Sequence, residues 1–244
     1  MNHEIPEETA IPVARAPGRW EILFEILLVA LTGFLVIPLV ASSLGYDPQL
    51  FLRSLPAFAS FLTLEATLTL GIVWLLLRRR NQGFDYFRRR TAIAFHEILI
   101  GLAVTPFLFL LVAGVSAVFQ AFFPHWVTLE NPLLRLVRTP SDVLLLVLTS
   151  VYVGGFKEEI QRAFVLERFR ENLGGAGLGL VLWSAFFGYG HALQGVDNAV
   201  ATGLLGLVFG ALYLWRGSLC APITAHAAFN TLTTLFYWFL GPGP

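Results

Sequence analysis

The chain has 244 residues and a mass of 27.0 kDa, with 56% hydrophobic residues, 13% charged residues and a net charge of zero. A typical soluble domain carries roughly 25% charged residues, so this composition, with a mean hydropathy of +0.71, excludes a soluble enzyme and a nucleic-acid binder. The apolar runs are continuous rather than alternating, which excludes an outer-membrane barrel. We predict an all-α, multi-pass transmembrane helical bundle. Its one cysteine, Cys220, excludes an internal disulfide and is typical of an inner or plasma membrane.

The order of polar and apolar stretches predicts three regions along the chain. Residues 1–19 are polar and form a cytoplasmic amino-terminal tail. Residues 20–94 hold the amino-terminal transmembrane helices, and residues 95–244 form the functional core. Because a span needs about 20 apolar residues, the sequence predicts seven helices, at about 20–44, 55–77, 95–123, 141–160, 176–193, 198–215 and 219–240. Pro38 and Pro106 lie inside two of them and should kink those helices.

An arginine-rich loop at 78–90 separates the second predicted helix from the third. It contains six arginines in thirteen residues. Short Lys/Arg-rich loops stay in the cytoplasm, so we place this loop and the amino terminus inside, and the carboxyl terminus outside. We expect the loop to orient the protein and to touch anionic lipid, with no part in catalysis.

Two glycine patterns predict close packing rather than chemistry. The run from Gly174 to Gly179 is typical of a turn that leads into a closely packed helix. The pair Gly206 and Gly210 lets another helix approach.

Ionisable residues at membrane depth are candidates for function, because each costs a few kcal/mol to place there. Glu65 lies midway along the second predicted helix, and we favour a structural hydrogen bond over a cavity role. Glu158 and Glu159 end an apolar run, and Arg162 is near enough along a helix to pair with either acid. Adjacent carboxylates repel, so one should hold its proton unusually well, as a general acid or base does. The alternative is a solvated helix end with snorkelling charges.

Two histidines follow in the carboxyl-terminal half. His191 ends an apolar helix, and His226 lies four residues before Asn230, on the same face of the last helix. A single histidine inside a membrane usually makes an interhelical hydrogen bond. Together with the paired carboxylates, however, these residues can activate water: an acid takes the proton, imidazoles bind water or metal, and an amide holds an oxyanion.

These residues resemble the CAAX protease and bacteriocin-processing family of intramembrane proteases, also called the type II CAAX prenyl endopeptidase or Abi family. The family pattern is Glu-Glu-x-x-x-Arg, then Phe-x-x-x-His, then His-x-x-x-Asn or -Asp. Phe187-x-x-x-His191 and His226-x-x-x-Asn230 match it in spacing and order, and the resemblance covers about residues 95–240. It implies an all-α protease core with a polar cavity that opens towards the cytoplasm.

The first motif departs from the family pattern, because Glu158-Glu159-x-x-Arg162 is one residue short. If Arg162 anchors the alignment, Lys157 occupies the position of the first, catalytic glutamate. If the acids anchor it, both glutamates are kept and the arginine is displaced. Helix geometry favours the second alignment, since a long arginine can reach in from a neighbouring position, and it predicts that Lys157 faces the lipid headgroups.

The resemblance implies an intramembrane endopeptidase that acts on a membrane-associated protein or peptide substrate. Glu158 is then the base, with its charge state set by Glu159 and Arg162. His191 and His226 bind the water or a metal, and Asn230 stabilises the oxyanion. His191, His226 and Glu158 are able to hold Zn²⁺ or another divalent metal, and the same groups can also work without one. The alternatives are a non-catalytic scaffold or chaperone, for which Lys157 is the sign, and a small proton-coupled transporter.

Overall fold

The computed structural model describes residues 17–32, 42–43, 54–90, 93–128 and 133–241 of the chain. The described residues contain helices and no β-strand. The helices are α1 (Arg19–Leu31), α3 (Leu55–Arg79), α4 (Ala94–Phe122), α5 (Pro140–Ser150), α6 (Glu159–Asn172), α7 (Ala176–Gly190), α8 (Val196–Arg216) and α9 (Cys220–Leu240). A π-helix, η6 (Val151–Glu158), joins α5 to α6, so these three elements form one long rod.

Within the described residues, each of the seven apolar segments predicted from the sequence overlaps one helical rod, which confirms the all-α bundle, but the fourth rod continues past the predicted end at residue 160 to Asn172. The amino-terminal tail and Pro38 lie outside the described residues, apart from residues 17–19 at the end of the tail. Pro106 lies inside α4, which stays helical on both sides of it. Local signals set several helix ends: Ser54 caps α3, Thr139 and Asp142 form a capping box at α5, and α8 ends at Gly217 in the left-handed conformation.

The protein is a membrane protein. Among the described helices, α3, α4 and α8 are long and apolar enough to cross a bilayer. In the most apolar window of α4, only 17% of the residues are buried inside the bundle. Large side chains such as Phe107 and Leu110 are 68% exposed on its surface. An apolar helix that keeps its side chains outside the protein core is suited to contact with lipid.

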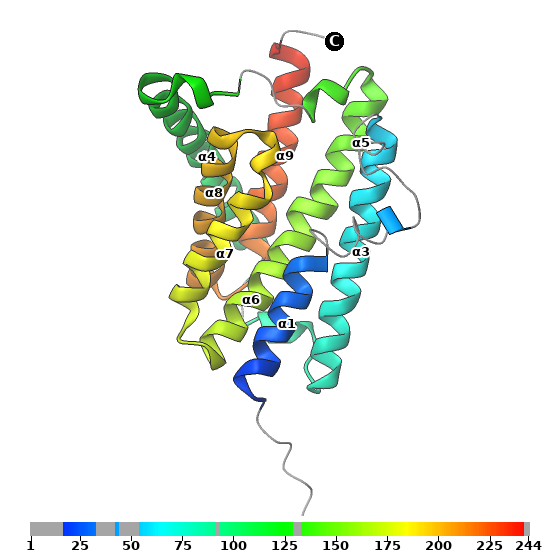
Figure 1. Cartoon of the computed structure of the whole chain (residues 1–244), viewed down its shortest axis with the longest axis vertical. Coiled ribbons are helices and arrows are strands. Elements are labelled where there is room, and N and C mark those ends of the chain that lie inside the picture. The colour runs from blue at the N-terminus through cyan, green and yellow to red at the C-terminus, as the bar shows by residue number, and fades with distance from the viewer. Residues whose placement is uncertain (1–16, 33–41, 44–53, 91–92, 129–132, 242–244) are drawn as a thin grey trace, which may run out of the picture.

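The rods run roughly along one axis and form two groups around the central rod α5–η6–α6 (Figure 1). Helices α4, α7, α8 and α9 form one group, in which α4 packs on α9 and α7 packs on α8. Helices α1 and α3 lie on the other side of the central rod. The central rod therefore has neighbours on both sides along its length, and the residues of α6 that follow the junction with η6, from Gln161 to Phe169, are all buried.

A buried network of charges ties the arginine-rich loop to the rest of the bundle. Glu25 of α1 accepts hydrogen bonds from Arg80 and Arg168, and Arg89 pairs with Glu167 at 3.1 Å. Burial raises the pKa of the Tyr86 phenol, which donates to Glu171. The loop, the start of α1 and the carboxyl end of α6 therefore lie at the same end of the bundle.

The two glycine patterns have the packing roles predicted from the sequence. Gly174 and Gly175 have positive φ angles of 98° and 101° at the turn before α7. A Cβ at Gly179 would lie 2.6 Å from the Cβ of Phe169, so only glycine lets α7 approach α6 this closely.

Candidate active site

The two glutamates of the first motif lie where the π-helix η6 gives way to the α-helix α6. Glu158 is the last residue of η6 and Glu159 is the first residue of α6. A π-helical turn holds one residue more than an α-helical turn, so it rotates the residues before it relative to those after it. Single π turns inside α-helices are frequent at functional sites. In this chain the turn coincides with the motif whose spacing departs from the family pattern by one residue.

Glycines bring this junction close to α9. A Cβ built on Gly154 would lie 2.5 Å from Nδ2 of Asn230 and 3.2 Å from Nε2 of His226. One built on Gly155 would lie 3.1 Å from the Cβ of Ala227. Because these two glycines have no side chain, His226 and Asn230 of the third motif pack directly against the backbone of η6.

Glu159 is the buried centre of the site. It is 1% exposed, accepts a hydrogen bond from Arg162 and lies 2.7 Å from Nδ1 of His226. The arginine neutralises the carboxylate in a place where water cannot, so the carboxylate can stay ionised and accept the Nδ1 proton. Nε2 of His226 is then the unprotonated nitrogen of the ring. Arg162 therefore pairs with Glu159 rather than with Glu158.

Glu158 lies on the opposite edge of the same imidazole. Its Oε2 is 3.8 Å from Nε2 of His226, and its side chain is 15% exposed, against 1% for Glu159. The two neighbouring carboxylates thus have different surroundings: one is fully buried and neutralised, and the other is partly open. This difference is what a general base needs beside a group that orients the histidine.

Aromatic rings hold Arg162 and His226 in place. The guanidinium of Arg162 lies over the rings of Phe187 and Phe209, at 4.8 and 5.5 Å from the ring centres. The ring of Phe209 also stacks on His226 at 4.4 Å. Gly210 leaves room for this arrangement, since a Cβ there would lie 3.3 Å from Cδ of Arg162. Phe187, the first residue of the second motif, therefore helps to fix the arginine of the first motif.

His191 stands apart from this group. It follows the last residue of α7, its Nδ1 lies 2.9 Å from the carbonyl oxygen of Phe187, and its ring contacts the ring of Phe187. Within the described residues, no hydrogen bond or ion pair joins His191 to Glu158, Glu159 or His226. The second motif reaches the site through its phenylalanine, and a direct part for His191 stays a prediction.

The predicted metal site was His191, His226 and Glu158. In the part of the chain that the structure describes, no group of three or more His, Cys, Asp or Glu side chains is arranged to hold a metal ion. Nδ1 of His226 lies against Glu159, as in many metal-binding histidines, and this leaves Nε2 for a ligand. A metal at these residues therefore stays a prediction, and the proposed mechanism uses the side chains alone.

The prediction that Lys157 faces the headgroups is wrong. Lys157 is 7% exposed, and its Nζ lies 2.9 Å from Oε2 of Glu65, which also accepts a hydrogen bond from Thr69. The rotation that η6 imposes turns the lysine into the bundle, where a carboxylate from α3 neutralises it. Nζ is also 4.0 Å from Oε1 of Glu158, so a buried cation lies next to the site.

Sequence reasoning missed three contributors to the site. Nothing in the sequence singles out Phe209 as a site residue, because it is one aromatic residue in an apolar helix. Gly154 is visible only as one of two neighbouring glycines before the acids. The ion pair of Lys157 with Glu65 could not be predicted, because a π-helix has no sequence pattern of its own. The predicted hydrogen bond of Glu65 is present, together with the ion pair to Lys157.

Comparison with known proteins agrees with the resemblance seen in the motifs. Residues 139–232 match the family described as type II CAAX prenyl endopeptidase Rce1-like. The match begins at the cap of α5 and ends in α9, so it contains the first, second and third motifs. No curated protein and no solved structure matches the chain. Glu65 lies outside the matched residues.

Proposed function

We propose that the protein, which matches the type II CAAX prenyl endopeptidase Rce1-like family over residues 139–232, is an intramembrane endopeptidase. The observation that carries the proposal is the position of His226 between two unlike carboxylates. Nδ1 lies against the buried, arginine-paired Glu159, while Nε2 points to the partly open Glu158. A histidine oriented by one carboxylate and opposed by another is suited to bind a water molecule from which the second carboxylate removes a proton.

In the proposed mechanism a water molecule donates hydrogen bonds to Glu158 and to Nε2 of His226. Glu158 takes one proton as the water oxygen forms a bond to the carbonyl carbon of the substrate. The negative charge moves to the carbonyl oxygen, which Asn230 stabilises through its amide nitrogen. The C–N bond then breaks, and Glu158 gives its proton to the leaving amine. The products are a carboxylic acid and an amine, and no further reactant is needed.

Glu159 and Arg162 act through His226 rather than on the substrate. The ionised Glu159 fixes the ring of His226 with Nε2 free, as the aspartate of a serine-protease triad does for its histidine. Arg162 keeps that carboxylate ionised without water. We therefore treat both as positioning residues, which refines the role that the sequence suggested for them.

The proposed substrate is a membrane-associated protein or peptide, cut near its carboxyl terminus. The basic loop, the start of α1 and the end of α6 lie at one end of the bundle, and we propose that this end faces the cytoplasm. The remaining predicted spans would then cross the bilayer between this end and the opposite one.

The experiment that tests the proposal uses the full chain in proteoliposomes. Peptides with a prenylated and an unmodified carboxyl-terminal cysteine motif are added, and their products are identified by mass spectrometry. Wild type should release a carboxyl-terminal fragment. Asn230→Ala should slow this release by about 10²–10³-fold, as removal of an oxyanion donor does elsewhere. Release that is equal in wild type and in Asn230→Ala would contradict the proposed role of the amide.

A non-catalytic scaffold is the second candidate, and one observation favours it. Nζ of Lys157 lies 4.0 Å from Oε1 of Glu158. A lysine this close can hold the Glu158 carboxylate in an ion pair and away from a water molecule. If no peptide is cut and Lys157→Met/Glu65→Met also stays inert, the scaffold is the better account.

A further inference from the structure

The arginine-rich loop has two kinds of arginine. Arg80 and Arg89 reach into the bundle and pair with Glu25 and Glu167. Arg78 and Arg79 end α3 on its exposed side, and no described carboxylate lies within ion-pair distance of either one. Arg80 and Arg89 therefore stabilise the fold, whereas Arg78 and Arg79 place two adjacent positive charges, without a described carboxylate partner, at the end of a membrane-crossing helix.

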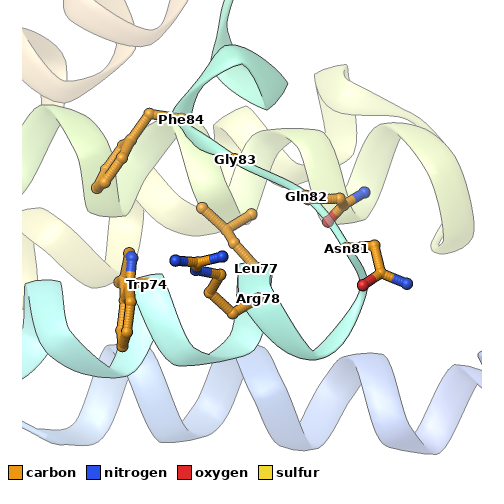
Figure 2. Close-up of a pocket in the computed structure, with 7 residues that line it drawn as sticks. All are labelled: Trp74, Leu77, Arg78, Asn81, Gln82, Gly83 and Phe84. Atoms are coloured by element: carbon orange, nitrogen blue, oxygen red, sulfur yellow. The ribbon is translucent and has the colours of Figure 1, made fainter.

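One of these two arginines lines a pocket. The pocket has a volume of about 420 Å³ and lies between the end of α3 and the turn into η3 (Phe84–Phe87). This volume falls within the roughly 300–1,000 Å³ of typical small-molecule sites. Its lining includes Trp74, Arg78, Asn81, Gln82 and Phe84. Figure 2 shows Phe84 projecting from the turn towards Trp74, with Arg78 beside the indole. None of the residues that line the pocket is acidic.

The polar groups of the pocket are mostly hydrogen-bond donors. The guanidinium of Arg78 lies 5.3 Å from the centre of the Trp74 ring, which holds it without neutralising it. The side-chain oxygen of Gln82 already accepts a hydrogen bond from Arg168 at 3.1 Å, so its amide nitrogen is left to donate. Asn81 adds a second amide at the tip of the turn, where its φ of 54° suits asparagine or glycine.

The pocket lies at the depth of the lipid headgroups. Helix α3 has 25 residues, hence a length of about 37 Å, and the hydrocarbon core is about 30 Å thick. The last turn of α3 therefore reaches the polar boundary. Trp74 is 44% exposed one turn before Arg78, and Phe84 is 50% exposed, in the positions that aromatic residues take at membrane interfaces.

We propose that this pocket binds the phosphate-bearing headgroup of an anionic phospholipid. Arg78 pairs with the phosphate, the amides of Asn81 and Gln82 donate to the phosphate or to the polar headgroup, and Trp74 and Phe84 contact the first carbons of the lipid chains. Charge selects an anionic lipid over a zwitterionic one. The apolar walls and the depth of the pocket select a lipid over a soluble phosphate. The site is separate from the pair Glu158–His226, so the inference does not depend on the proposed endopeptidase activity.

Native mass spectrometry of the full chain in detergent tests the proposal. Short-chain phosphatidylglycerol and phosphatidylcholine are titrated separately, and inorganic phosphate is added to the phosphatidylglycerol complex as a competitor. We expect one phosphatidylglycerol molecule to bind at least tenfold more tightly than phosphatidylcholine. Millimolar inorganic phosphate should not displace it. Equal binding of the two lipids, or displacement by phosphate, would overturn the proposal.

Arg78→Gln and Arg79→Gln form a matched pair, because both remove one charge from the same helix end but only Arg78 lines the pocket. Arg78→Gln should weaken phosphatidylglycerol binding at least tenfold. Arg79→Gln should weaken it by at most about fivefold, the contribution of one charge near an anionic surface. Equal losses would mean diffuse attraction and no site.

Asn81→Gly is the second variant, since it removes an amide while keeping the turn. It should weaken phosphatidylglycerol binding several-fold and leave phosphatidylcholine binding unchanged. Unchanged phosphatidylglycerol binding in this variant, with an intact turn, would show that Asn81 does not contact the headgroup and would overturn the assigned contacts. Thermal unfolding of each variant without lipid shows whether the fold is intact.

Discussion

The ion pair between Lys157 and Glu65 gives the sharpest test of the structure. The two side chains are 9% and 5% exposed, and Nζ and Oε2 lie 2.9 Å apart. Replacing Lys157 with methionine keeps most of the apolar side chain but leaves the Glu65 carboxylate buried without its cation. Breaking a buried pair in this way typically costs about 3–5 kcal/mol. Because Glu65 keeps its hydrogen bond from Thr69 and can take up a proton, we expect about 3 kcal/mol.

The double variant Lys157→Met/Glu65→Met separates the pair from its surroundings. Two apolar side chains of similar volume leave no buried charge, and such replacements are often close to neutral. The free energy of unfolding should therefore fall by about 3 kcal/mol in each single variant and by about 1 kcal/mol or less in the double variant. A double-mutant cycle, measured by denaturant unfolding in detergent micelles, gives the coupling energy directly.

Arg79→Met is the control, because it removes an exposed cation from the end of α3. Its cost should lie within about 0.5 kcal/mol, as for most surface substitutions. If Lys157→Met cost as little as Arg79→Met, the lysine would lie among the headgroups. The burial of the pair, and with it the rotation by the π-helix, would then be wrong.

Three further predictions follow from the packing. Gly154→Ala should push the Asn230 amide aside and lower the rate of proteolysis at least tenfold with little loss of stability. Gly155→Ala should lower stability more than the rate of proteolysis, and equal rates of proteolysis in the two variants would refute this prediction. Arg168→Met should lower the free energy of unfolding by about 2 kcal/mol, because buried Glu25 loses one charged hydrogen-bond donor but keeps Arg80. Burial raises the pKa of Tyr86, so the folded state holds this proton above pH 10, where the unfolded chain loses it. The contribution of Tyr86 to the free energy of unfolding should therefore be constant below pH 10 and fall above it, and Tyr86→Phe should reduce that fall.

Helices and their order could be predicted from the sequence because both depend on local patterns. Long apolar runs, proline and glycine positions and capping residues are all visible along the chain. Within the described residues the seven predicted segments accordingly overlap the helical rods, although the fourth rod runs on to Asn172. The structure also brings together the side chains of Glu158, Glu159, Arg162, His226 and Asn230. The spacing of His226 and Asn230 by four residues was enough to put them on one face of α9.

The direction of the Lys157 side chain could not be predicted, because it depends on a π-helix, which has no recognisable sequence pattern. Helix geometry with 3.6 residues per turn assigned the lysine to the headgroups, and one extra residue per turn moved it into the bundle. His191 was grouped with His226 on motif order alone. The distance between side chains on α7 and α9 is a property of packing, and here Phe187 rather than His191 reaches the site.

The role of Glu158 as the base beside His226 is central to the proposed mechanism. The measurement that tests it is the single-turnover rate of peptide cleavage by Glu158→Gln, compared with wild type and with Lys157→Met. Removal of a general base should lower the rate by about 10²–10⁴-fold, with the melting temperature nearly unchanged because Glu158 is partly exposed. A rate in Glu158→Gln within threefold of a measurable wild-type rate would contradict the account and move the base to another residue.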